Sequence, residues 1–238
     1  MGLMSNVPKI KKKELDVYYL IDVSGSMSGD KIKTVNRAMK EITPMLKDIA
    51  EGHVDTNVRV SVLTFGNGKA KWHTERVPAA QFHFEEITKV DGDTPLGNAL
   101  NVLNMALDQK EYSSKNVAPL IVLLSDGQPN DSYMKNLEKL YTLPFGKKAI
   151  KTALAIGKDA DVKKLEEFTR SKKHIVTSDN ISTIIEYIKW TTTTIERIAA
   201  NGGNDDDIPQ FYSPSAPGSV DRLSIANSVL DDDNNERI

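Results

Sequence analysis

Three oxygen-bearing side chains follow an apolar run near the start of the chain: Asp22, Ser24 and Ser26. They recur at every second position, so an extended backbone would point them the same way, and Gly25 would let the chain turn between the two serines. Carboxylate and hydroxyl oxygens without sulfur or imidazole suit Mg²⁺ or Mn²⁺ better than zinc. The same residues also fit a strand-to-helix turn capped by hydroxyls. A metal site therefore needs ligands from elsewhere in the chain.

Two later stretches offer such ligands. Thr94 stands before Pro95, which is typical of a helix start with a hydroxyl N-cap and proline in the first turn. Asp126 follows the most apolar run of the chain, residues 118–124. Each residue has a simpler role open to it: Thr94 as an N-cap, Asp126 as a turn residue, and the serines as loop hydroxyls that bond nearby backbone. Only their joint placement favours a metal site.

Three further polar residues could form the rim of such a site. Asp93 adds a negative charge beside Thr94, which could strengthen metal binding or repel an acidic partner. Asn130 and Asp131 come shortly after Asp126 and could also reach the rim, although the commoner role for these residue types is to cap the helix that follows.

The elements that must position these residues follow from the apolar pattern. Strands are predicted at residues 17–23, 58–65, 71–77, 118–124, 148–156 and 174–177, and helices at residues 32–49, 96–107, 130–140, 161–169 and 181–198. Pro44 should kink the first helix or mark its last turns, and Ser28 or Asp30 can cap its start. The third strand follows the hairpin sequence Gly66-Asn67-Gly68 and carries charges that suit an edge.

Alternating strands and helices predict the α/β class, with a doubly wound, mostly parallel central sheet, one antiparallel edge strand and helices on both faces. In such a sheet the ligand site lies outside the carboxyl ends of the strands, and right-handed crossovers keep those ends on one side. Asp22, Thr94 and Asp126 should therefore meet at one edge of the sheet.

The chain divides into three parts by composition. Residues 1–13 are a short basic lead, residues 14–200 carry the predicted elements, and residues 201–238 form an acidic, Ser- and Pro-rich tail expected to be disordered. The tail has eight acidic and two basic residues, which leaves +4 on residues 1–200 out of a total of −2. Its carboxylates could occupy a metal site, although acidic runs are more often simply solvated.

Composition and net charge exclude several classes of function. With 39% hydrophobic and 27% charged residues and no cysteine, the chain is ordinary for a globular protein without disulfides. A charge of +4 on residues 1–200 gives no signature of nucleic-acid binding. The first apolar run is too short for a signal or membrane segment, so a cytoplasmic protein without membrane association is expected. The four histidines show no ligand spacing for zinc.

The segment Asp22-Val23-Ser24-Gly25-Ser26, followed by Thr94 and then Asp126-Gly127, resembles the metal-ion-dependent adhesion site of von Willebrand factor A domains, in a match over about residues 14–200. The resemblance implies that Ser24, Ser26 and Thr94 ligate the metal directly, while Asp22 and Asp126 hold it mainly through waters. Neutral hydroxyls donate little charge, so the ion stays electrophilic and can accept an Asp or Glu carboxylate from a partner protein.

Within that family, the chain resembles the bacterial tellurium-resistance-associated, TerY-type group through Thr-Pro-Leu-Gly at residues 94–97, Leu-Ser-Asp-Gly-Gln-Pro-Asn-Asp at residues 124–131 and the stretch at residues 187–191. This group is encoded beside protein kinase-like and protein phosphatase 2C-like proteins. The resemblance therefore implies a scaffold in a stress-response or phospho-signalling complex.

An alternative is a Mg²⁺-dependent, phosphatase-like hydrolase that uses Asp22 as nucleophile. Haloacid-dehalogenase-type chemistry needs a second acid two residues later, where this chain has Ser24. The sequence also lacks a phosphate-binding loop, a dinucleotide-binding fingerprint and a nucleophile elbow. We therefore expect a binding module and not an enzyme.

Overall fold

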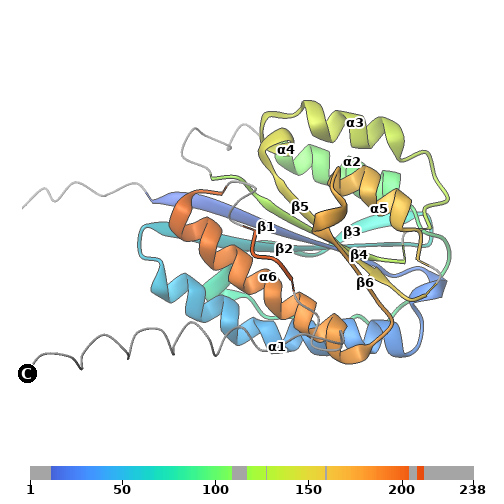
Figure 1. Cartoon of the computed structure of the whole chain (residues 1–238), viewed down its shortest axis with the longest axis horizontal. Helices are drawn as coiled ribbons and strands as arrows, with labels where there is room; N and C mark the ends of the chain where they lie inside the picture. Colours follow the sequence, from blue (N-terminus) through green and yellow to red (C-terminus); the bar gives the residue numbers. More distant parts are fainter. Residues whose placement is uncertain (1–11, 109–116, 127, 159, 204–207, 212–238) are drawn as a thin grey trace, which may run out of the picture.

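A computed structural model describes residues 12–108, 117–126, 128–158, 160–203 and 208–211 (Figure 1). The strands are β1 (Lys13–Asp22), β2 (Thr56–Gly66), β3 (Lys69–Pro78), β4 (Leu120–Ser125), β5 (Ile150–Ile156) and β6 (Ile175–Ser178). The α-helices are α1 (Asp30–Gly52), α2 (Leu96–Leu107), α3 (Met134–Thr142), α4 (Pro144–Lys148), α5 (Val162–Thr169) and α6 (Ile181–Asn201). Short 3₁₀ turns are η1 (Gly25–Met27), η2 (Ala79–Gln81) and η3 (Lys172–His174).

The described strands form one sheet in the order β3-β2-β1-β4-β5-β6. All neighbouring pairs are parallel except β2 and β3, which form an antiparallel hairpin at one edge. The doubly wound sheet with an antiparallel edge is therefore confirmed. Ile21 of β1 pairs with Leu124 of β4, and Asp22 pairs with Phe65 of β2. This register brings the carboxyl ends of the three central strands to the same edge.

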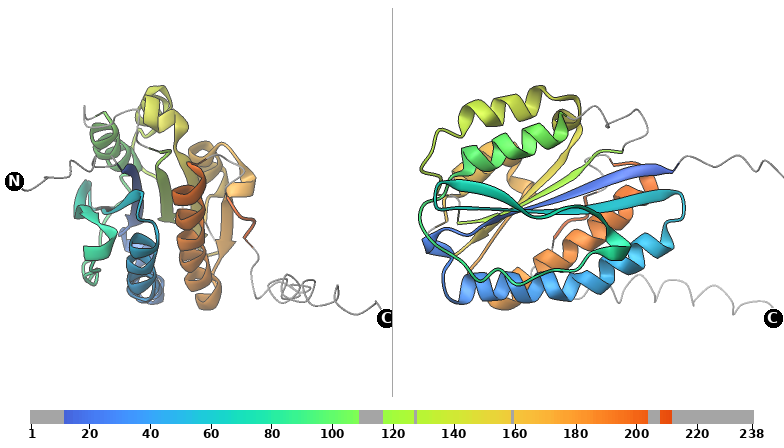
Figure 2. Two further views of the ribbon diagram at one scale, coloured as in Figure 1. Left: turned by 90° about the vertical axis from the view of Figure 1, so that its left-hand side faces the viewer. Right: turned by 180° about the vertical axis from the view of Figure 1, so that it is seen from behind.

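Helices cover both faces of the sheet, as Figure 2 shows: α1 and α6 lie on one side, and α2 and α3 on the other. Because side chains alternate along a strand, Tyr19 and Ile21 of β1 enter the core under α1 and α6, whereas Tyr18 and Leu20 enter the core under α2, α3 and α5. A central strand buried on both faces needs this continuous apolar run.

The starts of α1 and α3 differ from those expected from the sequence, because the preceding loops determine where these helices begin. Gly29, with a φ of 77°, occupies the N-cap of α1 without a side-chain capping bond, so the expectation of Ser28 or Asp30 as cap is wrong. Pro44 lies inside α1 and precedes its last turns, which continue to Gly52. Helix α3 begins at Met134 and not at residue 130, because residues 128–133 form a loop that bonds to α2.

The long connection between η2 and α2, residues 82–95, lies against α1 without forming a helix or a strand. In the right-hand view of Figure 2 it runs along α1 toward the end of the sheet that carries the site loops. Phe82, Phe84 and Ile87 are buried in the core. The amide side chain of Asn36 donates to the Ile87 carbonyl and accepts from the Ile87 N–H, at 2.9 and 3.0 Å, so one buried residue satisfies the backbone there.

The two ends of the chain are described only in part. Lys13, assigned to the basic lead, already pairs with Thr56 in the sheet, whereas residues 1–11 lie outside the described residues. Residues 204–207 and 212–238 of the acidic tail also lie outside them. Residues 208–211 are described, and the Phe211 ring packs on Tyr187 and Trp190 of α6 with centroids 5.5 and 5.9 Å apart. No helix in the described ranges is long and apolar enough to cross a membrane.

Candidate metal centre

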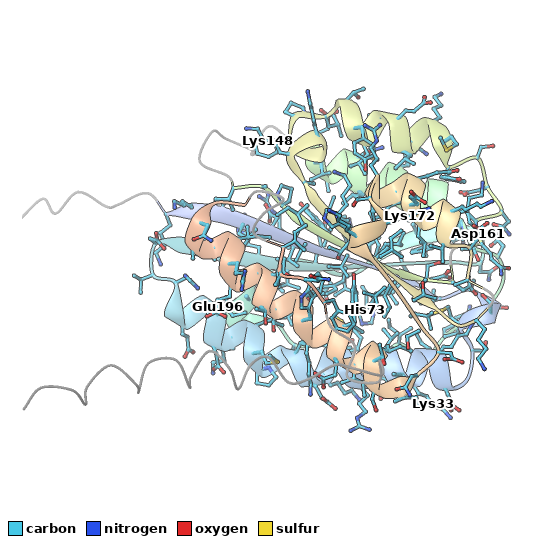
Figure 3. All side chains as sticks on the ribbon, in the orientation of Figure 1. Lys33, His73, Lys148, Asp161, Lys172 and Glu196 are labelled. Atoms are coloured by element: carbon cyan, nitrogen blue, oxygen red, sulfur yellow. The ribbon has the colours of Figure 1, made fainter. Side chains whose placement is uncertain are left out.

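The predicted ligands come from loops at the carboxyl end of the parallel strands. Asp22 ends β1, Asp126 follows β4, and Thr94 lies just before α2. Asp161, which precedes α5, is at this end of the molecule in Figure 3, whereas Lys148 lies nearer the opposite end. The loops contact one another through their backbones: the Gly25 N–H donates to the Gly92 carbonyl, and the Asp161 N–H to the Asp126 carbonyl, both at 2.9 Å.

The first loop brings its three oxygen-bearing side chains, those of Asp22, Ser24 and Ser26, close together, but by a different backbone path from the extended one expected. Asp22 is fully buried, and its Oδ1 accepts from the Ser24 N–H at 2.9 Å. Ser24 Oγ lies 3.0 Å from Ser26 Oγ. The chain leaves the extended conformation after Ser24 and forms the η1 turn, so a turn and not a continuous strand sets the spacing of the serines. Gly25 has no positive φ, and its backbone is one that other residues can adopt.

The second loop holds Thr94 in a buried position, 6% exposed. Helix α2 begins at Leu96, and Pro95 occupies its N-cap, so the expectation of Thr94 as N-cap and Pro95 at N1 is wrong. The first amides of α2 are satisfied from another loop: Asp131 accepts from the Gly97 and Asn98 N–H groups at 2.8 and 3.0 Å. The Thr94 side chain is therefore not needed to cap α2.

The three residues predicted for the rim hold the loops in place. Asn130 Oδ1 accepts from the Thr94 N–H at 3.1 Å, and the Asn130 N–H donates to the Thr94 carbonyl at 3.2 Å. Asp131 caps α2 and not its own helix. The Asp93 carboxylate accepts from the Gly68 N–H in the β2–β3 hairpin. A Cβ on Gly97 would lie 2.9 Å from an Asp131 oxygen, so this approach requires glycine.

The electrostatics of the site are unbalanced. Asp126 is 3% exposed, and its Oδ1 has no hydrogen-bond partner in the described part of the chain. Its Oδ2 lies 3.8 Å from Lys31 Nζ, beyond hydrogen-bond distance. Burial raises the pKa of Asp22 to about 6, and the nearby Asp126 charge adds to this rise, while hydrogen bonds from Ser125 and Ser24 oppose it. An orphaned buried carboxylate oxygen costs about 1–3 kcal/mol or more.

These features fit a hard divalent cation. Two buried carboxylates with a weak counter-ion provide the negative charge, and Ser24, Ser26 and Thr94 provide hydroxyl oxygens, the donor type that Mg²⁺ and Mn²⁺ accept. No group of three or more His, Cys, Asp or Glu in the described ranges could hold a metal. An ion at this site would therefore depend on the hydroxyls.

Two residues that contact the acids of the site, Ser125 and Lys31, were not predicted from the sequence. Ser125 donates its hydroxyl to Asp22 Oδ2 at 2.6 Å. A hydroxyl at the last position of a buried strand, beside the strand that ends at Asp22, is a signal that could have identified it. Lys31, in the first turn of α1, lies 3.8 Å from Asp126, which is 95 residues away in the sequence, so no local pattern indicates this contact.

Comparison with known proteins gives the family. The family model described as von Willebrand factor type A domain matches residues 16–190. The chain is 27% identical over 171 residues to inter-alpha-trypsin inhibitor heavy chain H1 of Bos taurus, which covers 66% of this chain and 18% of that protein. It is 32% identical over 130 residues to heavy chain H2 of Homo sapiens, covering 50% and 13%. The chain thus spans less than a fifth of the length of these relatives.

Solved structures show the same fold at low sequence identity. The pilus adhesin SpaC of Lactobacillus rhamnosus GG, in its open conformation, aligns with a TM-score of 0.62 at 15% identity over 78% of this chain and 30% of that one. A von Willebrand factor type A protein of Catenulispora acidiphila aligns with a TM-score of 0.57 at 17% identity over 78% and 43%. With a family match over most of its length and this sheet topology, the chain belongs to the von Willebrand factor type A domain family.

Proposed function

We propose that this chain is a protein-binding module that holds Mg²⁺ or Mn²⁺ at the Asp22–Asp126 site and recognises a partner through an Asp or Glu carboxylate. The observation that carries the proposal is the buried Asp126 Oδ1, which lacks a partner in the described part of the chain and lies close enough to Asp22 to raise its pKa. Within the described part of the chain, Asp126 Oδ1 therefore has no hydrogen-bond donor, and the two neighbouring acids have only Lys31, 3.8 Å from Asp126, as a paired cation. When bound, the ion supplies an electrophilic centre for an incoming carboxylate.

The residues have distinct roles in this proposal. Ser24, Ser26 and Thr94 are the direct ligands, and Asp22 and Asp126 act mainly through waters. The hydrogen bonds of Asp22 support this division, because both its oxygens already accept from the protein, from the Ser24 N–H and the Ser125 hydroxyl. Mg²⁺ gives up its waters reluctantly, so outer carboxylates can balance its charge without entering the inner shell.

The geometry of Asp22 does not favour the hydrolase alternative. A nucleophilic carboxylate must reach the substrate with a free oxygen, whereas Asp22 is fully buried and bonded through both oxygens. Binding roles also fit the similar proteins, one of which is named as a pilus adhesin.

For the cellular setting we propose a bacterial stress-response or phospho-signalling complex of the tellurium-resistance type, in the cytoplasm, with a Ser/Thr kinase-like and a protein phosphatase 2C-like protein as partners. The support is the TerY-type pattern at residues 94–97 and 124–131. These segments bond directly to each other through Asn130 and Asp131, so the resemblance covers the parts that shape the site.

A pull-down from the lysate of the source cell tests the proposal. Wild type, Asp126→Ala and the control Asp48→Ala, an exposed acid on α1, are compared in Mg²⁺ and in EDTA, with circular dichroism to confirm folding. We expect a partner that wild type and the control retain in Mg²⁺ and lose in EDTA, and that Asp126→Ala never retains. Equal recovery under all conditions would refute metal-dependent recognition.

A further inference from the structure

A hollow of about 560 Å³ adjoins the loop at residues 22–26, which we call the metal loop. It lies between the edge hairpin and the connection before α2. Lys69, Lys71 and His73 of β3 line one side, and Lys89 with residues 86–88 lines the other. We call this hollow the basic groove. Its volume is within the range of about 300–1,000 Å³ that is usual for ligand sites.

Positive charge is in excess in the basic groove, which is lined by three lysines and two acids. Within the described ranges, Lys69, Lys71 and Lys89 take part in no ion pair. Glu86, an acid in the lining, is already paired with Lys40 of α1 at 2.7 Å. The second acid, Asp91, lies at the end near the metal loop. A chain with a net charge of −2 thus presents three free lysines in one hollow, and concave walls strengthen the field of such a cluster.

The basic groove is continuous with the candidate metal site. Val23, which lies between Asp22 and Ser24, lines the groove, and its carbonyl accepts from the Asp91 N–H at 2.9 Å. The backbones meet closely at this junction: a Cβ on Gly66 would lie 2.7 Å from the Val23 carbonyl oxygen, and one on Gly92 would lie 2.7 Å from Asn67 Cα. Glycines therefore bring the metal loop and the groove wall into direct contact.

The spacing of the lysines suits an extended chain. Lys69 and Lys71 are two residues apart on β3, so their side chains leave the same face of the strand, about 6.6 Å apart along it. Alternate residues of an extended peptide have the same repeat. Acidic side chains at alternate positions of a bound segment could therefore meet successive lysines.

We propose that the basic groove binds an extended acidic segment of a partner protein, with one carboxylate at the metal and further acidic side chains along Lys69, Lys71 and Lys89. This inference rests on the proposed function, because the groove extends the same recognition site. Charge complementarity and continuity with the metal loop favour this occupant over an apolar segment or a neutral ligand.

Fluorescence anisotropy with a labelled ten-residue oligo-glutamate, against a serine–glycine peptide of equal length, tests this inference. The full chain is compared with the groove variant Lys69→Gln/Lys71→Gln/Lys89→Gln. The matched control, Lys135→Gln/Lys139→Gln/Lys163→Gln, removes three exposed lysines from α3 and α5. We expect wild type and control to bind oligo-glutamate equally and the groove variant to bind about tenfold more weakly, since each exposed pair contributes modestly.

The thermal shift on adding Mg²⁺ separates the two proposals. A groove variant that keeps the wild-type Mg²⁺ shift but loses oligo-glutamate supports the inference, whereas equal binding by groove and control variants overturns it and leaves the metal proposal standing. Absence of a Mg²⁺ shift in wild type would instead refute the proposed function. An increase in affinity of about tenfold in Asp231→Asn/Asp232→Asn/Asp233→Asn would identify the tail as the occupant and overturn the partner assignment.

Discussion

Two buried acids on strand β1 differ in whether a cation of the protein pairs with them. Asp16, near the start of the strand, is 2% exposed and pairs with the Arg76 guanidinium at 3.2 and 3.5 Å. Asp22, at the end of the strand, is fully buried beside Asp126. Among the described residues, Asp126 forms one ion pair, with Lys31 at 3.8 Å. The first acid is satisfied by the fold itself. The pair at the other end lacks a full counter-charge, which is what a site for an external cation requires.

Removing the internal counter-ion of Asp16 should have the largest effect. Arg76→Met leaves Asp16 buried without a partner, so we expect a loss of about 3 kcal/mol or more in the free energy of unfolding. The control Arg37→Met breaks an exposed pair with Glu41 on α1 and should cost less than about 1 kcal/mol. Denaturant unfolding measures both. Equal losses would show that burial of the carboxylate does not decide the effect.

At Asp22, by contrast, removing the charge of the acid should stabilise the metal-free protein, by an amount that depends on pH. Because burial raises the pKa of Asp22 to about 6, the folded state binds its proton more tightly than the unfolded state, so this contribution to stability is present at low pH and is lost as pH rises through 6. We expect that, in EDTA, the stability advantage of Asp22→Asn over wild type grows from pH 5 to pH 8. Melting temperatures across that range measure it, and parallel curves would contradict the unbalanced charge.

Mg²⁺ should reverse this pH dependence in wild type. Protons and the metal compete for the same acids, so the stabilisation by Mg²⁺ should be full above pH 6 and decline as pH falls through 6. The measurement is the difference in melting temperature with and without Mg²⁺ at each pH. A difference that stays constant from pH 5 to pH 8 would mean that Asp22 does not take part.

The smallest effect is expected at Lys31. Its ammonium lies 3.8 Å from Asp126, and its side chain is 34% exposed, so in the proposed site it would compete with the metal for this acid. The substitution Lys31→Gln should strengthen Mg²⁺ binding about fivefold. The reason is that the attraction between the Lys31 ammonium and the Asp126 carboxylate, which competes with the metal, is lost, and at this distance and solvent exposure it amounts to roughly 1 kcal/mol. Calorimetric titration with Lys33→Gln as control measures it. Weaker binding in Lys31→Gln would mean that the lysine supports the site.

The fold could be predicted from the sequence because its signals are local. The apolar run at residues 118–124 indicated a buried strand, and the apolar pattern at residues 96–107 indicated a helix. In the structure this pattern corresponds to the buried Leu96, Leu100, Leu103 and Leu107. The helix caps could not be predicted in the same way. Thr94 and Pro95 form a good local start signal, but Asp131, 34 residues beyond Gly97, caps α2 from another loop. A contact of this kind depends on the tertiary structure.

In the candidate site, too, residues close in sequence could be predicted, whereas contacts that depend on the tertiary structure could not. Asp22, Ser24 and Ser26 were grouped from their spacing, although a 3₁₀ turn and not an extended strand brings the serines together. Ser125 and Lys31 approach the acids only through strand pairing and the turn before α1. The packing of Phe211 on α6 was also beyond prediction, because a single aromatic residue in a polar tail gives no periodic signal.

The proposed metal site depends on Asp126, whose buried Oδ1 has no hydrogen-bond partner in the described residues. Calorimetric titration of Mg²⁺ and Mn²⁺ into wild type and Asp126→Asn at neutral pH tests it most directly, with the unfolding transition confirming that both are folded. We predict binding by wild type and a loss of about tenfold or more in the variant, as expected when a supporting carboxylate is removed. No binding by wild type, or equal affinity in the two proteins, would contradict the claim.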